Sequence, residues 1–492
     1  MLVELRLRAP GEKAAGFRRI STMLMGFGFV QMLTGCITAE RPGLDVDIPP
    51  AYRAGRGDTA PPQLDWWRGF RSPELTALIE EARRANFDIA AAIARIEQAD
   101  AQSKIAGVPL LPAVNLNATV THSRSSQAGG SSVVSGGGGG SERTTYQTAL
   151  NASYQFDFWG KNRANSRAAE ENAIAFRFSH DVVALSTVAS VATDYFLVLS
   201  SQDRLRTARE NLAAATRVLD LIQQRFNAGT ASQLDVAQQE SLVATQRAAI
   251  PPLDQAVRQS IAALAALVGR APANLKVRGG SLYRLAIPRV TPGLPSEVLI
   301  QRPDIRAAEA SLASADASVE AARAAFFPTI SLTGQYGIVS TSLKTLFTPQ
   351  AIFYSIAAGL AQPVFDGFLL EGQFEQAKGR QIELLQAYRK TVVQAFSDVE
   401  IALIAIADQT ERERLQRDVV MASRRAFEIA ETRLREGTVD LVTVLQTQQT
   451  LFQAEDTLAV VRLARMLAVL SLFQALGGGW MPPPGTDVVT IQ

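Results

Sequence analysis

Four segments of the chain alternate between apolar and polar residues with a period of two. They span residues 114–123, 146–158, 330–338 and 352–360. In the first segment Val114, Leu116 and Val120 share one face, while Asn115 and Thr119 lie on the other. This alternation is typical of β-strands that have one apolar and one polar face, and about ten residues are enough for a tilted strand to cross the hydrocarbon layer of a membrane. The pattern therefore predicts four two-faced strands.

Such strands fit either a half-buried sheet in a soluble domain or a sheet that lies in a membrane. Aromatic residues near the segment ends favour the membrane, where they form girdles at the two interfaces; they are Tyr146, Phe158, Trp159, Tyr336, Tyr354 and Phe365. The first two strands are joined by residues 123–145, a stretch rich in serine and glycine that includes Gly136–Gly140. No Gly-Lys-Ser/Thr follows these glycines, so they indicate a polar surface loop rather than a phosphate-binding loop.

A long stretch of helical pattern follows each pair of strands. No proline occurs in 161–226 or in 368–434, and apolar residues recur there at spacings of three and four. This periodicity is typical of coiled coils. About 65 residues at about 1.5 Å each predict helices about 100 Å long, which exceeds the width of a compact domain.

Each long stretch ends in a turn that leads into a return helix. Gly229 and Gly437 suit the left-handed conformation that closes a helix, and Ser232 and Asp440, three residues later, are good N-caps. We therefore expect two long helical hairpins. The return helix of the first should be kinked or bent at Pro251-Pro252.

The two hairpins belong to two halves of the chain that repeat each other. Five blocks recur in the same order at an offset of about 210 residues, which chance similarity would not produce. They are Phe87–Ile89 with Pro303–Ile305, Pro112–Leu116 with Pro328–Leu332, Phe158–Gly160 with Phe365–Gly367, Arg225–Thr230 with Arg433–Thr438, and Ala266–Gly269 with Ala475–Gly478. The chain is therefore a tandem duplication in which each half reads helix, strand, strand, long helix, turn and helix.

Four strands are too few to close a membrane barrel alone. Every backbone donor and acceptor must be paired inside a bilayer, and the smallest known membrane barrels use about eight strands. Two copies would give about eight strands and an interior filled by side chains, whereas three copies would give about twelve and an open lumen. We therefore expect a mainly α-helical chain whose four strands complete a twelve-strand trimeric barrel, with long coiled hairpins that would reach deep into the periplasm.

The single cysteine, Cys36, predicts a lipid anchor. It follows the basic pair Arg18-Arg19, a mostly apolar stretch over 20–33 and the run Leu33-Thr34-Gly35. This order describes a secretory signal peptide, whose apolar stretch is too short to span a bilayer as a helix. The run before Cys36 resembles a bacterial lipobox, so we expect cleavage before this residue and acylation of its thiol. By resemblance to lipoprotein sorting rules, Ile37 at the next position favours the outer membrane. The alternative is a buried free cysteine.

Composition argues against several other classes of protein. The 492 residues carry a formal net charge of only +2, whereas a nucleic-acid-binding protein normally shows a strong positive charge or a basic stripe. The chain has two histidines, His122 and His180, so a His/Cys zinc or copper site has few ligands to draw on. No nucleophile, base and orienting residue can be assembled into a catalytic set. We expect neither an enzyme nor a metal or other cofactor, apart from the lipid on Cys36.

Two runs of sequence are specific enough to indicate a family. They are Leu299–Glu309, which contains Arg-Pro-Asp-Ile-Arg-Ala-Ala-Glu, and Ala322–Gly334, which contains Phe-Pro-Thr-Ile-Ser-Leu. Both are similar to runs in the outer-membrane factor family, the TolC-like proteins, and Trp66-Trp67 matches the lipoprotein branch of that family. The resemblance extends from about Trp66 to Trp480. Its departures are Gln301, where a second arginine is common, and an unusually long Ser/Gly loop.

The resemblance implies a homotrimer with a twelve-strand barrel and a tunnel of twelve helices. It also implies a periplasmic adaptor protein and a proton-driven inner-membrane pump as partners. Carried over by position, the adaptor docks at the turns of the hairpins, on Arg225, Gly229, Thr230, Ser232, Gly437 and Thr438. The periplasmic gate falls on Asp440 with Arg433 or Arg435. The same glycines, Ser232 and Asp440 can instead serve only as helix caps.

The expected function is that of the outer-membrane channel of a tripartite efflux pump, a passive conduit for small molecules and drugs. The outer channel of a type I protein-secretion system shares the fold and stays an alternative, as does a structural coiled-coil envelope lipoprotein. The expected division of the chain is a signal peptide over 1–35, a lipidated segment over 36–72, a first repeat over 73–270, a linker over 271–292, a second repeat over 293–478 and a tail over 479–492.

Overall fold

The computed structural model describes residues 48–53, 65–124, 142–288, 290 and 293–480. All of these belong to one compact unit that covers residues 46–492. Cys36, the signal peptide and Gly136–Gly140 lie outside the described residues, so the predictions made for them stay predictions.

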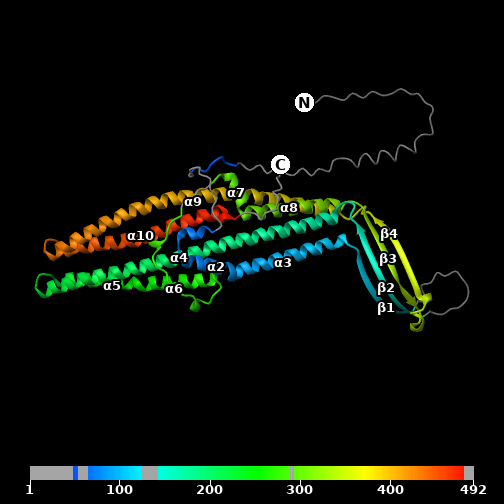
Figure 1. Ribbon diagram of the computed structural model, residues 1–492, viewed down its shortest axis with the longest axis horizontal. Helices are drawn as coiled ribbons and strands as arrows, with labels where there is room; N and C mark the ends of the chain where they lie inside the picture. The colour runs from blue at the N-terminus through cyan, green and yellow to red at the C-terminus, as the bar shows by residue number, and fades with distance from the viewer. Residues whose placement is uncertain (1–47, 54–64, 125–141, 289, 291–292, 481–492) are drawn as a thin grey trace, which may run out of the picture. The chain divides into compact units, whose positions relative to one another are not determined.

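The four predicted strands form one antiparallel sheet in the order β1-β2-β3-β4 (Figure 1). Their bounds are Ala113–Arg124, Glu142–Phe156, Thr329–Ser340 and Ile352–Ala361. One row across the sheet pairs Leu116, Leu150, Tyr336 and Tyr354, and the next row pairs Asn115, Asn151, Gln335 and Ser355. The register therefore collects apolar side chains on one face and polar ones on the other. The prediction of two-faced strands is confirmed; β2 begins four residues earlier than Tyr146 and ends before Phe158.

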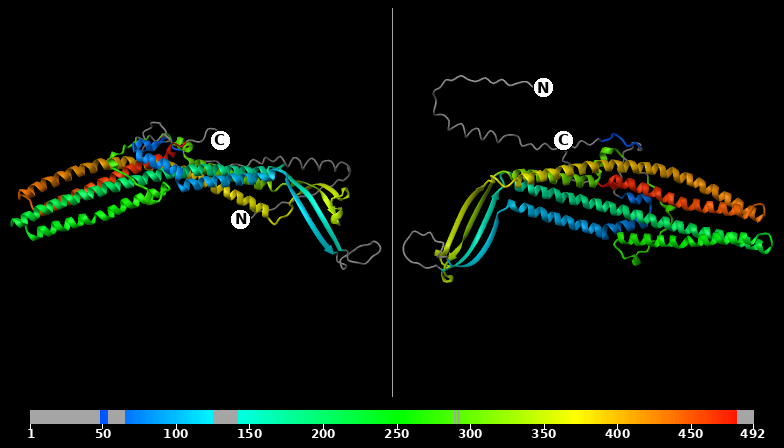
Figure 2. Two further views of the ribbon diagram at one scale, coloured as in Figure 1. Left: turned by 60° about the horizontal axis from the view of Figure 1, so that its bottom comes forward. Right: turned by 180° about the vertical axis from the view of Figure 1, so that it is seen from behind.

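A helix leads into or out of each strand. α3 (Phe87–Gly107) precedes β1, α4 (Lys161–Asn227) follows β2, α8 (Pro303–Ala324) precedes β3, and α9 (Leu369–Arg435) follows β4. α4 and α9 each contain 67 residues, as expected for the two copies of a duplicated element. The strands lie at one end of these helices, and the turns of the hairpins lie at the other (Figures 1 and 2).

The return helices differ between the two repeats. The first is divided into α5 (Gln233–Ala248) and α6 (Ile250–Leu267), and the break falls at Ala249, two residues before Pro251. Because a proline inside a helix removes a hydrogen bond and clashes with the preceding turn, this break confirms the prediction. The second return helix, α10 (Leu441–Ala475), is continuous.

Short elements connect the long helices and the strands. They are η2 (Trp66–Phe70), α2 (Pro73–Ala85), η3 (Val108–Leu110), η4 (Pro272–Asn274), η5 (Leu282–Arg284), α7 (Pro295–Gln301), η6 (Leu343–Thr345), η7 (Pro349–Ala351) and η8 (Gly477–Gly479). The largest core cluster lies beneath η2, where Trp66 stacks on Phe473 at 4.9 Å between ring centroids and Phe70 meets Phe196 edge to face at 5.0 Å. These aromatic contacts join the segment before the first repeat to α4 and α10.

Two helices contain a window apolar enough, by length and composition alone, to cross a membrane. They are α4 and α10, and in each about half of the window, 50% and 56%, is buried against other helices of the protein. Burial of this kind is what core helices of a bundle show.

Candidate functional site

The two hairpin turns close with the same hydrogen-bond pattern. In the first, Gly229 has a φ of +71° and donates to the carbonyl of Phe226 at 2.9 Å, while Thr230 donates to Arg225 at 2.8 Å. In the second, Gly437 has a φ of +73°, and the backbone bonds of Gly437 and Thr438 repeat this arrangement. This is a Schellman motif, in which a left-handed glycine satisfies the last carbonyls of a helix. Each threonine Oγ1 also donates to the same carbonyl as its own backbone N–H.

Both return helices begin with the predicted caps. Ser232 and Asp235 form a reciprocal capping box, in which each side chain accepts from the backbone N–H of the other residue. The Asp440 carboxylate accepts from the Thr443 backbone N–H at 2.8 Å. Hydrogen bonds from Thr443 lower the pKa of Asp440, so this exposed carboxyl is negatively charged at neutral pH.

The predicted gate pairs do not form among the described residues of one chain. Arg435 pairs with Glu431, one turn earlier on α9, at 2.6 Å. Arg433 contributes its carbonyl to the cap of Thr438. A different arginine joins the two hairpins at this end, since the Arg225 guanidinium donates to the carbonyl of Leu434. The turns are thus linked through Arg225, and the Asp440 carboxylate is used for capping.

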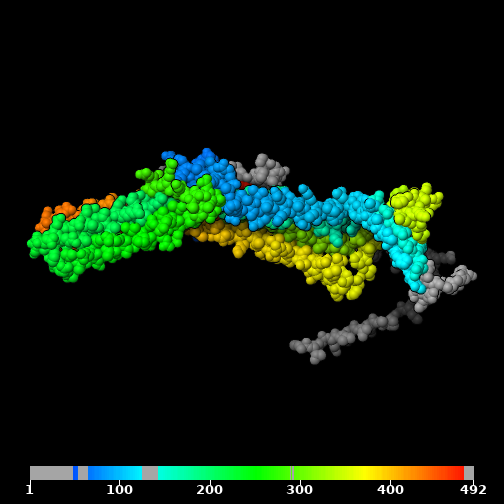
Figure 3. All heavy atoms as spheres, turned by 90° about the horizontal axis from the view of Figure 1, so that it is seen from below, coloured from blue at the N-terminus to red at the C-terminus, as the bar shows by residue number. Residues whose placement is uncertain are grey.

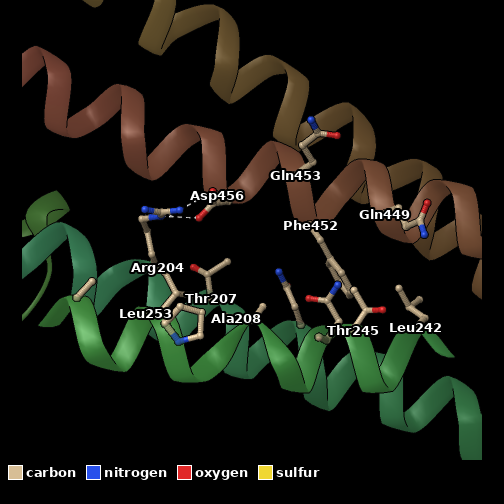
Figure 4. Close-up of a pocket in the computed structure, with 15 residues that line it drawn as sticks. Arg204, Thr207, Ala208, Leu242, Thr245, Leu253, Gln449, Phe452, Gln453 and Asp456 are labelled. Carbon is tan, nitrogen blue, oxygen red and sulfur yellow. Dashed lines mark hydrogen bonds and ion pairs between the residues drawn. The ribbon is translucent and has the colours of Figure 1, made fainter. Parts of the chain in front are cut away.

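A cavity of about 670 Å³ lies between the two hairpins, on the side of the turns that faces the sheet. It lies between α4, α5, α6 and α10, and Phe452 points into it from α10 (Figure 4). At the end of the cavity farther from the turns, the Arg204 guanidinium of α4 donates two parallel hydrogen bonds to the Asp456 carboxylate of α10, at 2.7 and 3.0 Å. Among the residues that line the cavity, this ion pair joins the two hairpins.

Within the described residues, the two outer strands of the sheet, β1 and β4, have no partner along their outer edges. All twelve residues of β1 are exposed, as are nine of the ten residues of β4. The exposed side chains include large apolar ones, such as Leu116 at 67% and Ile356 at 77% exposed. An exposed edge and an exposed apolar face are both unfavourable in water, and they mark surfaces that other molecules cover.

Comparison with known proteins decides the family. The model of the outer membrane efflux protein family matches residues 78–270 and 294–478, which is most of the chain.

The chain belongs to the outer membrane efflux protein family.

Relatives and solved structures agree with this assignment. The chain is 38% identical over 450 residues to the pyoverdine export outer membrane protein OpmQ of Pseudomonas putida, covering 91% of this chain and 95% of that protein. It is 28% identical over 475 residues to a probable outer membrane lipoprotein, SilC, of Salmonella typhimurium, covering 93% and 99%. The outer-membrane channel OprN superimposes with a TM-score of 0.83 at 25% identity, covering 90% and 99%. The protein is therefore an efflux channel of the outer membrane with a TolC-like, mainly helical fold.

This efflux protein also contains an ion cluster that the sequence did not reveal. The Glu413 carboxylate of α9 is fully buried and is bonded by Arg462 at 3.1 Å and Arg465 at 2.8 Å, both from α10, and by Arg417. Burial alone would raise the pKa of this carboxyl, but the hydrogen bond from Arg465 and the three positive charges lower it below its usual value. Glu413 is therefore ionised at neutral pH.

The cluster holds the segment between the two repeats onto the helices. Arg462 donates to the carbonyl of Leu285 at 3.3 Å and lies over the ring of Tyr283 at 5.7 Å. On the other side of the same segment, the buried Asp203 carboxylate of α4 accepts from the Leu282 backbone N–H at 2.8 Å. Spacing along the sequence offers no signal for these contacts, because the two hydrogen-bonded pairs lie 79 and 177 residues apart.

Proposed function

We propose that three copies of this efflux channel form a passive conduit that carries small molecules from a periplasm-spanning pump complex to the exterior. The observation that carries the proposal is the sheet with two unpaired edges and one apolar face. A lipid bilayer contains no water to satisfy the edge N–H and C=O groups, so β4 of one copy must pair with β1 of the next. Three four-stranded sheets then close a barrel of about twelve strands, which is wide enough for a lumen.

The register of the sheet assigns its two faces in this barrel. The apolar face, with Leu116, Leu150 and Tyr336, turns toward lipid, and the row of Asn115, Asn151, Gln335 and Ser355 turns toward the lumen. Uncharged amide and hydroxyl groups line the lumen at this level. They interact with solutes of either sign and hold none tightly, which suits a conduit that passes what a pump delivers.

The opposite end of the helices suits the role of an entrance. The turns at Gly229 and Gly437 are exposed and rigidly capped, and we assign to them the docking of a periplasmic adaptor that connects the channel to a proton-driven inner-membrane pump. Docking would use Arg225, Thr230, Ser232 and Thr438 beside these glycines. Three copies of Asp440 would bring like charges together at the entrance, where Arg433 or Arg435 of a neighbouring copy could hold the gate closed.

The N-terminus supports attachment to the membrane. Cys36 follows a lipobox-like run, and the relative SilC is named as a probable outer membrane lipoprotein. Acylation of Cys36 would add an anchor to the barrel. The relative OpmQ is named for pyoverdine export, which supports a small molecule as the cargo.

The experiment is insertion of the purified protein into planar lipid bilayers. We expect discrete conductance steps from the native protein. Leu116→Arg places a charge on the lipid face, which costs about 2–4 kcal/mol near the bilayer midplane, and should greatly reduce the frequency of insertion. Its matched control, Asn117→Arg, places the same charge on the lumen face of the same strand and should still insert. Native protein that produces no conductance, or two variants that behave alike, would contradict the proposal.

A further inference from the structure

Two segments at the two ends of the first repeat carry an excess of positive charge. They are residues 65–85, which include η2 and α2, and residues 269–288, which follow α6. In Figure 3 the first segment is blue and the second is green, and both reach the surface. Together they contain eight Lys and Arg residues but only four Asp and Glu residues, whereas the formal net charge of the whole chain is +2. We call the eight basic residues the basic patch, and all of them are exposed. They are Arg68, Arg71, Arg83, Arg84, Arg270, Lys276, Arg278 and Arg284.

Hydrogen bonds and an ion pair hold the two segments together along α2. Near the start of this helix, the Glu74 carboxylate accepts from the backbone N–H of Arg278 at 2.8 Å and from the Tyr195 hydroxyl at 3.1 Å. Farther along the helix, Arg270 pairs with Glu81. The basic side chains of both segments are therefore gathered on one part of the surface.

The acidic residues of the two segments have their partners within the protein. Asp65 and Glu80 both pair with Arg68, at 3.4 Å each, and Glu81 pairs with Arg270. The fourth carboxylate is held by the bonds at the start of α2. The other six members of the basic patch have no acidic partner among the residues that the structure describes. They are Arg71, Arg83, Arg84, Lys276, Arg278 and Arg284. Their charges are therefore available to an anion from outside the chain.

Arg71 is also held in an unfavourable backbone conformation. Its φ is +55°, and Phe368 is the one other residue besides glycine with a positive φ in the described part of the chain. Residues with a Cβ are strained in this region, and such strain is concentrated at functional surfaces. The backbone N–H of Ala286 donates to the carbonyl of Phe70 at 3.2 Å, which brings the segment that carries Arg284 to this position. A strained arginine thus stands where the two segments meet.

The second repeat has no equivalent of the basic patch. Residues 289–301, which correspond to α2, contain one arginine and one glutamate. Residues 478–492, which follow α10 as residues 269–288 follow α6, contain one aspartate and neither lysine nor arginine. Since both repeats build the same helices and strands without a shared patch, the fold does not require these charges. They indicate a separate role for this surface.

The basic patch lies far from both ends of the helices. α3 begins two residues after α2 and runs for 21 residues, about 30 Å, before β1. On the other side, α5 and α6 span residues 233–267, about 50 Å, between the first turn and the patch. Electrostatic attraction fades over about 8 Å in physiological salt. Lipid headgroups at the barrel and a partner confined to the turns are therefore both out of range.

We propose that the basic patch binds the carboxylates of the cell-wall polymer, the network of sugar strands and short peptides that fills part of the periplasm. The guanidinium group binds carboxylates through two parallel hydrogen bonds, and five of the six unpaired members of the patch are arginines. Three copies would carry three patches, so that contacts that are weak singly add to a stable attachment. The inference rests on the proposed function for the orientation of the helices in the periplasm and for the number of copies.

Sedimentation with purified cell-wall sacculi, freed of protein and lipid, tests this proposal. The native protein in mild detergent should pellet with the sacculi, and the bound fraction should fall as salt is added. Sacculi whose carboxylates have been converted to neutral amides should bind about tenfold less, or weaker still. Native protein that stays in solution with untreated sacculi, or that pellets equally with amidated sacculi, would overturn the proposal. Binding to soluble polyglutamate without binding to sacculi would overturn it in favour of an acidic protein as the partner.

Charge reversal on the second segment tests the residues. The combination of Lys276→Glu, Arg278→Glu and Arg284→Glu changes three exposed, unpaired side chains and should lower sacculus binding about tenfold or more. The same three positions changed to Gln remove the charge without adding repulsion and should also weaken binding. Native helix content by circular dichroism and an unchanged mass in detergent show that the variants are folded. A folded variant that binds as the native protein does would contradict the assignment.

A matched control makes the same change of charge closer to the turns. It combines Arg209→Glu, Arg217→Glu and Arg247→Glu, at three exposed residues that have no ion-pair partner among the described residues. This control should pellet as the native protein does, and an equal loss of binding would show that only the total charge matters and would overturn the basic patch. Both triple variants should keep the native conductance in planar bilayers. Native protein that pellets in a carboxylate-dependent way but gives no conductance would overturn the proposed function and leave the basic patch standing.

Discussion

The helices α4 and α9 have the same length and the same place in their repeats, yet they are packed very differently. Of 67 residues each, α4 buries 22 and α9 buries 11. Ile382, Val393 and Ile404 of α9 recur at intervals of eleven residues and are 54%, 58% and 47% exposed. The residue of α4 equivalent to Ile404 is Phe196, which is fully buried. Duplication has kept the helix and its apolar positions, but only α4 finds all its neighbours within one chain.

In the proposed trimer, this difference marks where one copy needs a neighbour. An apolar stripe on a long helix predicts a covering partner, because exposed apolar area is unfavourable in water. For α4 the partners are α8, α3, α6, α10, α5 and α2 of the same chain. Among the described residues α9 packs mainly on α10 and α8, with a smaller contact to α7, and its remaining face lies on the side of the open edge of β4. Strands and helices thus indicate the same missing neighbour.

The two helices also differ at one buried position. Glu413 of α9 holds three arginines, whereas the equivalent residue of α4 is Leu205, which is apolar and 8% exposed. Glu413→Ala should lower the free energy of unfolding by about 3–5 kcal/mol, because it leaves buried positive charges without their partner. Leu205→Ala, the matched variant, should cost about 2–5 kcal/mol through a cavity. Thermal unfolding followed by circular dichroism measures both. An unchanged midpoint for Glu413→Ala would contradict the claim that the three arginines need this carboxylate as their partner.

Low pH should reduce the stability of the second repeat, because it protonates the Glu413 carboxylate. Since the pKa of Glu413 is lowered in the folded protein, its contribution to stability is present above the ordinary value of 4.5 and is lost as the pH falls below it. The stability difference between the native protein and Glu413→Gln should therefore be constant near neutral pH and shrink below about 4.5. Thermal midpoints across a pH series would reveal this trend. A difference that is the same at low and neutral pH would contradict it.

The N-caps at the two hairpin turns allow a comparison with a smaller expected effect on stability, and it separates capping from gating. Ser232→Ala and Asp440→Ala each remove an N-cap and should each cost about 1 kcal/mol of helix stability. Asp440→Ala should in addition raise the conductance of the channel, since it removes a ring of like charges from the proposed gate. Ser232→Ala should leave conductance unchanged. Single-channel recordings of the two variants separate gating from capping, and equal conductance in both would limit Asp440 to a cap.

The smallest expected effect is that of replacing the glycines of α9, and its sign differs between an isolated copy and the trimer. In a helix exposed to water, Gly372→Ala or Gly379→Ala should stabilise the protein by about 0.5–1 kcal/mol. At a close contact with the next copy the same methyl group should weaken the trimer. We expect the temperature of trimer separation to fall while the helix content is retained. A rise in that temperature would place these glycines outside the contact.

The sequence predicts the repeating elements well, because these depend on local patterns. Alternation in residues 114–123 is enough for β1, and the Gly229–Ser232 and Gly437–Asp440 spacings are enough for both turns. Contacts between distant segments are not encoded in this way. Glu413 is separated from Arg462 by 49 residues, and nothing in the pattern of α9 distinguishes it from a surface glutamate. The expected pairing of Asp440 with Arg435 is absent within the described chain because each has a nearer partner, Thr443 and Glu431.

The most direct test of the account is the mass of the native protein in mild detergent, measured by light scattering with the detergent contribution subtracted. In the proposed trimer the strand edges are paired and the exposed apolar residues of α9 are covered, so we expect no stable closed form that contains one copy. We predict a single species that contains three copies. A single copy that remains soluble and folded without detergent would contradict the account, since the sheet and α9 would then need no neighbour.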